Sequence, residues 1–562
     1  MSTILTLHDP QTARQLYIDG TWKQDTMYGL LRDSARNRPD EYALRDRSVR
    51  LTWRELLTWV DAVAESLHQA GLRKGSRVCL WLPSRIESIV IFLACSRNGY
   101  ICNPSLHQNY TVEEIKQLLI RVDCEAFFGQ PLYGADAESH DIFQAISAIE
   151  SIKRVYRVSR KGHIDTLQEG EFAFPDNKSV VPSLPADDNP DKVVYLAFTS
   201  GTTGVPKGVM HSDNTLLANG RAMVKDWNHS TETILLSLSP ISHHIATVAL
   251  EQMLVAGFEL VLTDSADLKR PIDWIVETGA TYVMGVPTHA IDILAEMRRH
   301  EMEKLGAVKV FYMAGAPIPR DTAQGFLDIG ITPQNVYGMT ENGSHQYTLP
   351  TDDTDTIVST CGRACHGYEI KIWSQSNRDQ EVSPGEVGEI GTKGGLLMLG
   401  YFASQDATER SFNSHGYFLS GDLGSLDRNG CLTILGRVKD LIIRGGHNIH
   451  PARIEDLAIK HPSIIQAAAF AISDDRLGEK VCLAVIVEEH SVVEPEALLQ
   501  FLHDMGLSKF DMPEYFVVMK EFPRTASGKT LKREFVEWAK QGLFQPTAVR
   551  WKGGSQSKEV AV

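Results

Sequence analysis

The sequence predicts an α/β protein with a large N-terminal domain of layered α/β sheets, a small β subdomain within it, and a small C-terminal α+β domain. Three observations lead to this fold class. Apolar runs of strand length alternate with amphipathic runs of helix length over the first two thirds of the chain. Short alternating runs with glycine-rich turns follow, and a new mixture of patterns begins after residue 440. Strands that alternate with helices are typical of layered, largely parallel sheets.

In the N-terminal part, uninterrupted apolar runs predict buried strands, because a strand covered on both faces needs no polar alternation. Amphipathic stretches at residues 86–97 and 112–122 predict helices among them. The predicted strands are residues 77–81, 125–128, 195–199, 259–262, 282–286 and 309–313. Most of them are followed by a Gly/Pro turn or a helical stretch, which favours a parallel arrangement.

The last third of the chain predicts two further parts. Short alternating strands such as YEIKIW and CLTIL predict a small antiparallel β subdomain at about residues 367–436. Beyond it, helices are predicted at residues 452–460 and 495–503, and strands at 464–471, 481–487 and 515–518. We therefore expect an N-terminal domain over residues 1–439 and a C-terminal domain over residues 440–562.

Composition and charge exclude several classes of protein. The 562 residues are 43% apolar and 23% charged, as in a globular protein and unlike a disordered, collagenous or coiled-coil chain. The net charge of 56 − 71 = −15 argues against a general nucleic-acid binder, which needs a basic face. No apolar stretch approaches the ~20 residues of a membrane span, and the N-terminus lacks a secretory pattern. We therefore expect a cytoplasmic protein without integral membrane contact.

The strongest motif is the string YLAFTSGTTGVPKG at residues 195–208, in which an apolar strand runs into glycines, hydroxyl side chains and a lysine. Glycines let backbone N–H groups close around an anion, hydroxyls add donors, and a lysine supplies positive charge. The string predicts a phosphate cradle, although its spacing is not that of a Walker loop. A Gly/Thr-rich hairpin turn is the structural alternative. The candidate ligands are Thr199, Ser200, Gly201, Thr202, Thr203, Gly204 and Lys207.

Four further motifs follow in order along the chain. They are Tyr337-Gly338-Met339-Thr340-Glu341, Ser420-Gly421-Asp422, Gly436-Arg437-Val438-Lys439-Asp440 and Pro523-Arg524-Thr525-Ala526-Ser527-Gly528-Lys529. Together with the Gly/Thr string, this order resembles the adenylate-forming superfamily of acyl-CoA synthetases, aryl-CoA ligases, peptide-synthetase adenylation domains and luciferases. The likeness runs from about residue 25 to about residue 542. It is closest to medium-chain fatty acyl and cyclohexanecarboxylate-type CoA ligases.

The resemblance implies a site for ATP, later AMP, in the N-terminal domain. Tyr337 would stack on adenine, with the turn Gly315-Ala316-Pro317 on the other side of the ring. Asp422 would accept both ribose hydroxyls, and Arg437 would contact the ribose. Gly338, Met339 and Thr340 would line the same site.

The resemblance also assigns the chemistry of adenylation. Glu341 and Thr202 would help to hold Mg²⁺, for which carboxylate oxygen is a suitable hard ligand. Lys529 would bridge the substrate carboxylate and the α-phosphate, where charge develops in the transition state. Each of these side chains has a structural alternative, such as a turn former or a solvated lysine. The expected catalytic residues are Lys529, His243, Glu341, Thr202 and Arg437.

In this family a hinge precedes the small domain, and the resemblance places it at Asp440. Rotation there would withdraw the lysine loop and present a second face to the acyl-adenylate. Gly445 and Gly446 would let the pantetheine arm of CoA approach the backbone on that face. Candidate partners for the CoA phosphates, or else members of a solvated helix face, are Lys520, Arg524, Lys532 and Arg533.

The acid is expected to lie beside the SHH segment, where the resemblance places His243 near the substrate carboxylate as a gate between the two half-reactions. A buried pair of structural histidines is the alternative. The expected acyl-pocket residues are His243, His244, Val286, Ala314, Gly315, Gly338, Met339 and Gly343. None of them offers a spare acidic or basic anchor, which disfavours amino acids and favours an apolar monocarboxylic acid.

We therefore predict an ATP-dependent acid:CoA ligase that forms an acyl-adenylate and then transfers the acyl group to CoA. The expected substrates and cofactors are ATP with Mg²⁺, a medium-chain fatty, alicyclic or aryl acid, and CoA; nucleic acid is not expected, and a homodimer stays open. The nearest alternative is a freestanding adenylation enzyme that loads a carrier protein. A luciferase-type oxygenase, an ADP-forming phosphotransferase and an inactive scaffold are the others; the absent Walker spacing disfavours the phosphotransferase, and intact Lys529 and Glu341 disfavour the scaffold.

Overall fold

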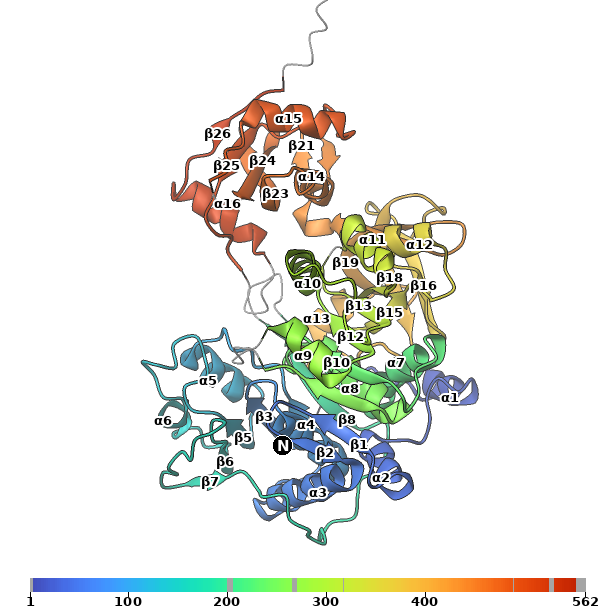
Figure 1. Cartoon of the computed structure of the whole chain (residues 1–562), viewed down its shortest axis with the longest axis vertical. Coiled ribbons are helices and arrows are strands. Elements are labelled where there is room, and N and C mark those ends of the chain that lie inside the picture. Colours follow the sequence, from blue (N-terminus) through green and yellow to red (C-terminus); the bar gives the residue numbers. More distant parts are fainter. Residues whose placement is uncertain are drawn as a thin grey trace, which may run out of the picture. The chain divides into compact units, whose positions relative to one another are not determined.

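The structure is a computed structural model that describes residues 4–199, 206–264, 270–316, 318–488, 490–524 and 530–551 (Figure 1). The chain divides into two compact units. Unit 1 comprises residues 1–371, 391–418 and 427–432, and unit 2 comprises residues 372–390, 419–426 and 433–562. Within the described ranges, no helix has both the length and the apolar character that crossing a membrane requires.

Unit 1 contains a seven-stranded sheet with the strand order β7-β6-β5-β3-β4-β8-β9. All neighbours are parallel except β8 and β9, which form an antiparallel pair. The strands are β3 (Arg77–Trp81), β4 (Ile101–Asn103), β5 (Ala126–Gly129), β6 (Arg154–Arg157), β7 (Glu171–Ala173), β8 (Val193–Thr199) and β9 (Lys207–Ser212). The helices of this part of the chain are α1 (Pro10–Ile18), α2 (Met27–Asn37), α3 (Trp53–Gln69), α4 (Ile86–Asn98), α5 (Val112–Arg121) and α6 (Ile142–Ile146).

A nine-stranded sheet in unit 1 has the order β16-β15-β14-β13-β12-β10-β11-β1-β2. The six strands from β14 to β1 are parallel, and β15, β16 and β2 are antiparallel to their neighbours. The strands are β1 (Tyr42–Arg45), β2 (Arg50–Thr52), β10 (Ile234–Ser237), β11 (Glu259–Leu262), β12 (Tyr282–Gly285), β13 (Val310–Met313), β14 (Thr332–Met339), β15 (Gly343–Tyr347) and β16 (Arg363–Ala364). The helices are α7 (Asp213–Asp226), α8 (His244–Ala256), α9 (Pro271–Thr278), α10 (Pro287–Arg299), α11 (Arg320–Asp328) and α12 (Thr354–Ser359).

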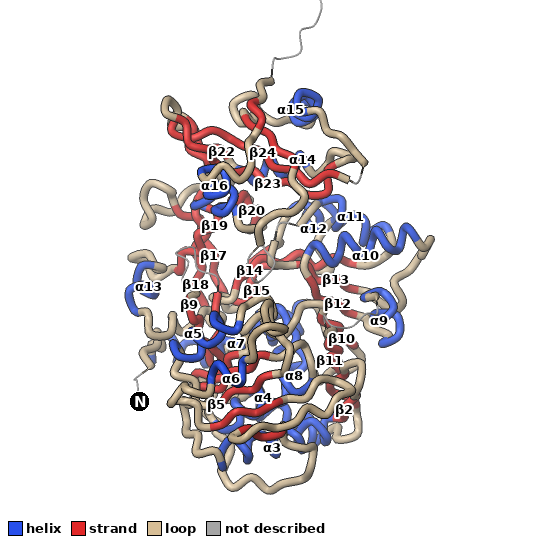
Figure 2. The backbone as a smooth tube through the Cα atoms, turned by 90° about the vertical axis from the view of Figure 1, so that its left-hand side faces the viewer, coloured by secondary structure: helices blue, strands red, loops and turns tan. Residues whose placement is uncertain are grey.

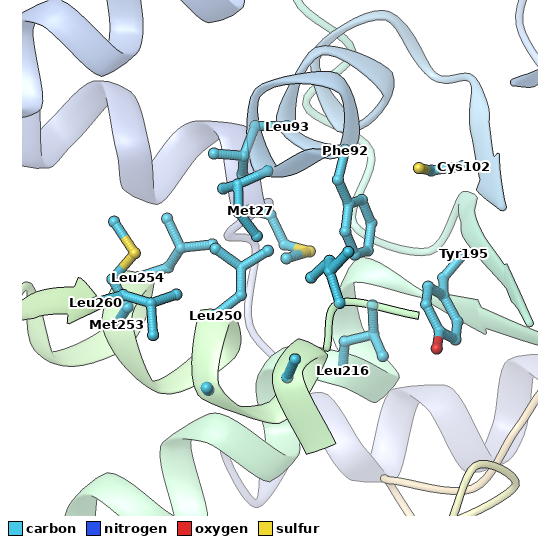
Figure 3. Packing of buried hydrophobic residues seen from close by; sticks show 14 of the residues in the cluster. Met27, Phe92, Leu93, Cys102, Tyr195, Leu216, Leu250, Met253, Leu254 and Leu260 are labelled. Carbon is cyan, nitrogen blue, oxygen red and sulfur yellow. The ribbon is translucent and has the colours of Figure 1, made fainter. Parts of the chain in front are cut away.

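The main apolar core of unit 1 is built around the helices α4 and α8, which are buried along nearly their whole length. Both helices are mostly apolar because neither one has a solvent face, although α8 also buries Thr247, Glu251 and Gln252. Phe92 of α4 stacks on Tyr195 of β8, and Leu250, Met253 and Leu254 of α8 lie in the same cluster (Figure 3). Figure 2 shows α8 beside β10 and β11, the two strands that it connects. The predicted α/β class with largely parallel sheets is thereby confirmed.

A four-stranded sheet occupies the segment where the sequence predicts the β subdomain, with the strand order β17-β18-β19-β20. Its strands are β17 (Tyr368–Trp373), β18 (Gly388–Gly394), β19 (Phe418–Leu426) and β20 (Leu432–Arg437), and the helix α13 (Gln405–Arg410) precedes β19. The sequence prediction did not include β19, because its central FLSGDLGSL run contains glycines and a charge that weaken the strand pattern.

Unit 2 ends in a six-stranded sheet with the order β22-β21-β24-β25-β26 and with β23 paired to β24. One apolar cluster joins the sheet to α14 and α15, and another, in which Phe470 stacks on Phe535, joins its other face to α16. The strands are β21 (Ile442–Arg444), β22 (His447–Ile449), β23 (Ile464–Asp474), β24 (Gly478–Val487), β25 (Tyr515–Val518) and β26 (Thr547–Ala548). The helices are α14 (Pro451–Ala458), α15 (Pro495–Asp504) and α16 (Lys532–Lys540). The domain boundary at residue 440 stays a prediction.

Candidate functional site

The predicted acyl-pocket residues of unit 1 meet at one edge of the nine-stranded sheet. The strands β10, β12, β13 and β14 are parallel neighbours, so their carboxyl ends lie together. Val286 follows β12, Ala314 and Gly315 follow β13, and His243 follows β10 at the start of α8. In open α/β sheets, ligands bind outside the carboxyl ends of the strands.

A tight hairpin between β14 and β15 presents the predicted Tyr-Gly-Met-Thr-Glu motif. A side chain on Gly338 would bring its Cβ to 1.9 Å from the carbonyl oxygen of Gly343, so only glycine fits there. Gly343 has φ +63°, a left-handed conformation that favours glycine, and the Oδ1 of Asn342 accepts the N–H of Met339 at 3.0 Å. The turn that carries Thr340 and Glu341 is therefore closely fixed.

Glu341 has a partner that the sequence did not reveal. The hydroxyl of Tyr401 donates to its Oε1 at 3.1 Å, and the Nζ of Lys207 lies 4.4 Å from the centre of the Tyr401 ring. Burial, and then the carboxyl group of Glu341, raise the pKa of Tyr401. The segment that carries Tyr401 is bound to β9 by backbone hydrogen bonds, such as that from the Phe402 N–H to the Gly208 carbonyl at 2.7 Å. Lys207 and Glu341, predicted from separate motifs, are thus close neighbours of one ring.

A chain of histidines runs from the Glu341 turn to α8. The Nε2 of His211, on β9, donates to the carbonyl of Thr340 at 2.7 Å, and the His211 ring stacks on His244 with 5.6 Å between ring centres. The Nδ1 of His244 lies 3.2 Å from the hydroxyl of Tyr195. Burial lowers the pKa of His211 to about 4 and that of His244 to about 3, so both rings are neutral at pH 7. His244 is half-buried, and its ring contacts those of His211 and Tyr195.

His243 is likewise half-buried and is the N-cap residue of α8. Its ring centre is 4.6 Å from that of His107, whose Nδ1 lies 3.0 Å from the Ser242 hydroxyl. Burial lowers the pKa of His107 to about 4, and a neutral ring fits a place beside His243. His107 was not predicted, because it lies more than one hundred positions away from His243 in the chain. His243 therefore reaches the sheet edge with a defined neighbour.

Tyr337 and Gly315 lie on the same edge. The ring of Tyr337 is 8% exposed and meets the ring of His345 edge-on, with 5.4 Å between the centres. Gly315 has φ +88° and is exposed, and a Cβ there would lie 3.6–3.7 Å from Val286 and Ile245. These contacts give an apolar wall beside an exposed backbone turn, which suits the predicted pairing of a planar base with an apolar acid.

The predicted ribose ligands lie in unit 2. Asp422 is 8% exposed, and the Nε of Arg437 is 3.2 Å from its Oδ1. Gly421, with φ +77°, donates its N–H to the Oε1 of Glu389 at 3.0 Å. The Asp422 N–H donates to the hydroxyl of Ser420 at 3.1 Å. The Ser-Gly-Asp motif is thus a fixed turn that orients one carboxylate toward Arg437. Asp440 is half-buried in the single 3₁₀ turn that follows β20.

Gly445 and Gly446 form the two-residue turn between β21 and β22, in which Arg444 and His447 are register partners. Their φ angles are +58° and +85°, as in the hairpin turns that twist with their strands. Both are exposed, and the N–H of Gly445 donates to the carbonyl of Leu477 at 2.7 Å. The backbone of this turn is therefore exposed and is not covered by side chains of its own.

Several predicted residues lie outside the described part of the chain, namely Ser200, Gly201, Thr202, Thr203, Gly204, Pro317 and Lys529. Thr199 and Lys207, on either side of the Gly/Thr string, are register partners of the antiparallel pair β8–β9. Two of the candidate CoA cations have protein partners: the Nζ of Lys532 lies 2.7 Å from Glu455, and Arg524 donates to Gln466 at 3.0 Å. The described residues contain no group of three or more metal-ligating side chains of the His, Cys, Asp and Glu types.

Comparison with known proteins agrees with this arrangement. The family model of the AMP-binding enzyme matches residues 31–402, and that of the AMP-binding enzyme C-terminal domain matches residues 453–529. The medium-chain fatty-acid–CoA ligase of Escherichia coli (strain K12) is 28% identical over 535 residues, 95% of this chain and 93% of the relative. The 2,3-dihydroxybenzoate-AMP ligase of Bacillus subtilis (strain 168) is 28% identical over 538 residues, 94% and 96% of the two chains. The crystal structure of ATP-bound MatB from Rhodopseudomonas palustris is 25% identical with a TM-score of 0.79, over 92% of this chain and all of that one.

The fold and the residues at the sheet edge define an adenylate-forming enzyme. The chain belongs to the AMP-binding enzyme family, whose model covers 372 of its 562 residues (31–402). It is an AMP-forming acid–thiol ligase, the enzyme class expected from the sequence.

Proposed function

We propose that this enzyme activates an apolar carboxylic acid, of the medium-chain fatty, alicyclic or aryl kind, and transfers the acyl group to CoA. The observation that carries the proposal is that one unit contains both a phosphate-side cluster, Lys207, Tyr401 and Glu341, and an apolar wall, Val286 and Ile245. The first group suits the nucleotide, and the second suits the acid.

In the first half-reaction, a carboxylate oxygen of the acid attacks the α-phosphorus of ATP, and pyrophosphate leaves with the electron pair of the broken bond. Lys207 would stabilise phosphate charge, and Lys529 would bring the carboxylate and the α-phosphate together. Tyr337 would hold the adenine, while Asp422 and Arg437 would hold the ribose. The apolar wall would keep the acyl chain out of water.

Glu341 offers one hard carboxylate oxygen donor, which fits Mg²⁺ because this ion is held by few carboxylates together with substrate phosphates. We propose that Glu341 and Thr202 hold it. When bound, the ion would neutralise charge on the phosphate oxygens. Tyr401 restricts the rotamer of Glu341 by its hydrogen bond, so the carboxylate is oriented before the nucleotide arrives.

In the second half-reaction, the CoA thiolate attacks the acyl carbon, the acyl–phosphate bond breaks, and AMP leaves. We propose that the C-terminal domain, residues 440–562, turns about Asp440 to present the turn of Gly445 and Gly446 for this step. His243 would close the acid site against water during adenylation and move aside when the thiol enters.

A second candidate function is the loading of an acyl or aryl acid onto a carrier protein. It is favoured by the 2,3-dihydroxybenzoate-AMP ligase, which is as similar to this chain as the fatty-acid ligase is. The test measures AMP, pyrophosphate and thioester from ATP, a panel of acids and either CoA or a phosphopantetheinylated carrier. A thioester with CoA supports the proposal. A thioester with the carrier alone supports the second function, and ADP as the product contradicts both.

A further inference from the structure

Helix α8 carries three fully buried polar side chains below His243. Thr247, Glu251 and Gln252 are each 0% exposed; Thr247 and Glu251, four positions apart, share one face of the helix, and Gln252 follows Glu251 in the chain. Other positions of the same helix, among them Leu250 and Met253, lie in the apolar core (Figure 3). The helix therefore has one apolar side and one side of buried polar groups, which is unusual in a core.

Within the described chain, several polar atoms of these side chains and of Gln334 lack hydrogen-bond partners, although the Nε2 of Gln252 donates to the carbonyl of Val248 at 3.3 Å. Among the residues that the structure describes, no hydrogen-bond partner is found for the Oγ1 of Thr247, both carboxyl oxygens of Glu251, the Oε1 of Gln252 and the Nε2 of Gln334. A buried polar atom left in this way costs about 1–3 kcal/mol, and nearly all such atoms in native proteins are paired. Five such atoms in one region are donors and acceptors that a further polar group would pair.

Tyrosines from three strands surround the same place. The hydroxyl of Tyr195 lies near Thr247 and Glu251, and burial followed by the Glu251 carboxyl raises the pKa of Tyr195. The Glu251 carboxyl also raises the pKa of Tyr312, after burial. Tyr282 donates to the Oε1 of Gln334 at 2.6 Å. Burial raises the pKa of Glu251 well above its usual range, which favours its neutral form, with one O–H donor and one carbonyl acceptor. We call Tyr195, Thr247, Glu251, Gln252, Tyr312 and Gln334 the buried polar cluster.

The buried polar cluster lies beneath the acid site. Helix α8 connects the parallel neighbours β10 and β11. It therefore starts near the carboxyl ends of the strands, where His243 is its N-cap, and runs toward the opposite edge of the sheet. Glu251 is eight residues beyond His243, about 12 Å along a helix. Tyr312 is two residues before Ala314 and Tyr282 is four before Val286, about 7 and 13 Å along a strand. Three separate elements thus carry these side chains about 7–13 Å back from the sheet edge.

We propose that the acid substrate bears a hydroxyl group on its chain, and that Glu251 with Thr247 and Gln252 receives it at this depth. The inference rests on the proposed function, whose substrate class it narrows. A hydroxyl both donates and accepts, which matches a cluster that offers the Gln252 acceptor beside the Glu251 and Gln334 donors. A plain alkyl chain would leave these atoms unpaired, and an ammonium group would need Glu251 ionised in an apolar site.

The test compares saturated acids of one chain length with and without a hydroxyl at successive carbons, by kcat/KM for pyrophosphate release. We expect a hydroxylated acid to be preferred at least about 10-fold over its plain counterpart, since a site with buried polar groups discriminates against an analogue that leaves them unpaired. Glu251→Leu should reverse this preference with the KM for ATP unchanged, and Glu251→Gln should keep part of it. Met253→Leu, on the apolar side of α8, is the matched control and should keep the preference.

Equal kcat/KM for plain and hydroxylated acids in the wild type would overturn the inference and assign the cluster to buried water. A preference that Glu251→Leu leaves unchanged would overturn it as well. If Glu251→Leu does not fold, Thr247→Val supplies the second measurement and should weaken the preference. If no acid of any kind gives AMP and pyrophosphate, the proposed function fails instead, so the two failures are distinguishable.

Discussion

The hydroxyl of Tyr401 donates a hydrogen bond to the carboxylate of Glu341 across 3.1 Å, and the ring of Tyr401 lies beside the ammonium of Lys207. One aromatic side chain therefore separates a cation expected at the phosphates from an anion expected at the metal. Tyr401 thus contacts both charged groups, and its hydrogen bond orients the carboxylate of Glu341.

Tyr401→Phe removes this hydrogen bond and keeps the ring. A hydrogen bond to a charged group contributes about 1.5–3 kcal/mol, so kcat/KM for pyrophosphate release should fall about 10- to 100-fold, with more Mg²⁺ needed for half-maximal rate. Tyr347→Phe removes another tyrosine–carboxylate bond, to Asp226 at 2.7 Å, and should lower the melting temperature without changing the Mg²⁺ requirement. An unchanged rate in Tyr401→Phe would show that Glu341 needs no positioning.

Lys529→Ala tests the assignment of the bridging lysine. Adenylation, followed as hydroxylamine-trapped acid, should fall by about 100-fold or more because charge at the reacting oxygens loses its stabiliser. Thioester formation from a supplied acyl-adenylate and CoA should change little. Lys540→Ala, which removes an exposed lysine paired with Glu537 at 2.8 Å, is the control and should affect neither step. Equal losses in both half-reactions would contradict a role of Lys529 in adenylation alone.

Gly446→Ala tests the turn between β21 and β22. With φ +85°, an alanine there is strained by about 1–2 kcal/mol, and its methyl group would occupy the bare backbone proposed for the pantetheine arm. We expect a raised KM for CoA and a slower thioester step, with adenylation unaffected. Gly506→Ala, at φ +89° with open space around it, carries the same strain and should leave the KM for CoA unchanged. Equal effects of the two variants would show that the change comes from lower stability and not from a lost contact with CoA.

Acid should destabilise the protein through its buried histidines. Burial lowers the pKa of His229 to about 4 and that of His345 to about 3, below the ordinary 6.5. Between those values the unfolded chain binds more protons than the folded one, so stability is complete above pH 6.5 and is lost as the pH falls toward 4. For His229 the shift corresponds to roughly 3 kcal/mol. Thermal unfolding across this range measures the loss.

His345→Leu should make this pH dependence shallower. Within the described part of the chain neither ring nitrogen of His345 has a hydrogen-bond partner, so an apolar side chain removes a group that acid would charge. His163→Leu replaces an exposed histidine and should leave the dependence as it is. A steeper acid transition in His345→Leu would show that the ring stabilises the fold in its charged form.

Long apolar runs made much of the fold predictable. The strands at residues 77–81, 259–262 and 515–518 were predicted with the bounds that the structure has, because each is a short unbroken apolar run beside a turn. The sequence did not reveal β21 and β22, since three-residue strands depend on a partner for their pairing. The helix α16 was missed because it buries only Phe535 fully.

The site was predictable where motifs are local. The Tyr-Gly-Met-Thr-Glu and Ser-Gly-Asp strings contain their own turn glycines, so residue type and spacing sufficed. Tyr401, His211 and His107 were missed because each reaches the site through a contact distant in sequence. The expected acid-pocket residues at this helix ended at His244, seven residues before Glu251.

His243, proposed as the gate, is the N-cap of α8. Two turns further along the same helix lies Glu251, whose carboxyl group is proposed to bind the hydroxyl on the acid's chain. Entry control and tail selection would then both belong to one short segment, the helix and its N-cap residue. Substitutions in this segment alone could therefore change which acid a relative prefers, while the residues that bind the nucleotide stay the same.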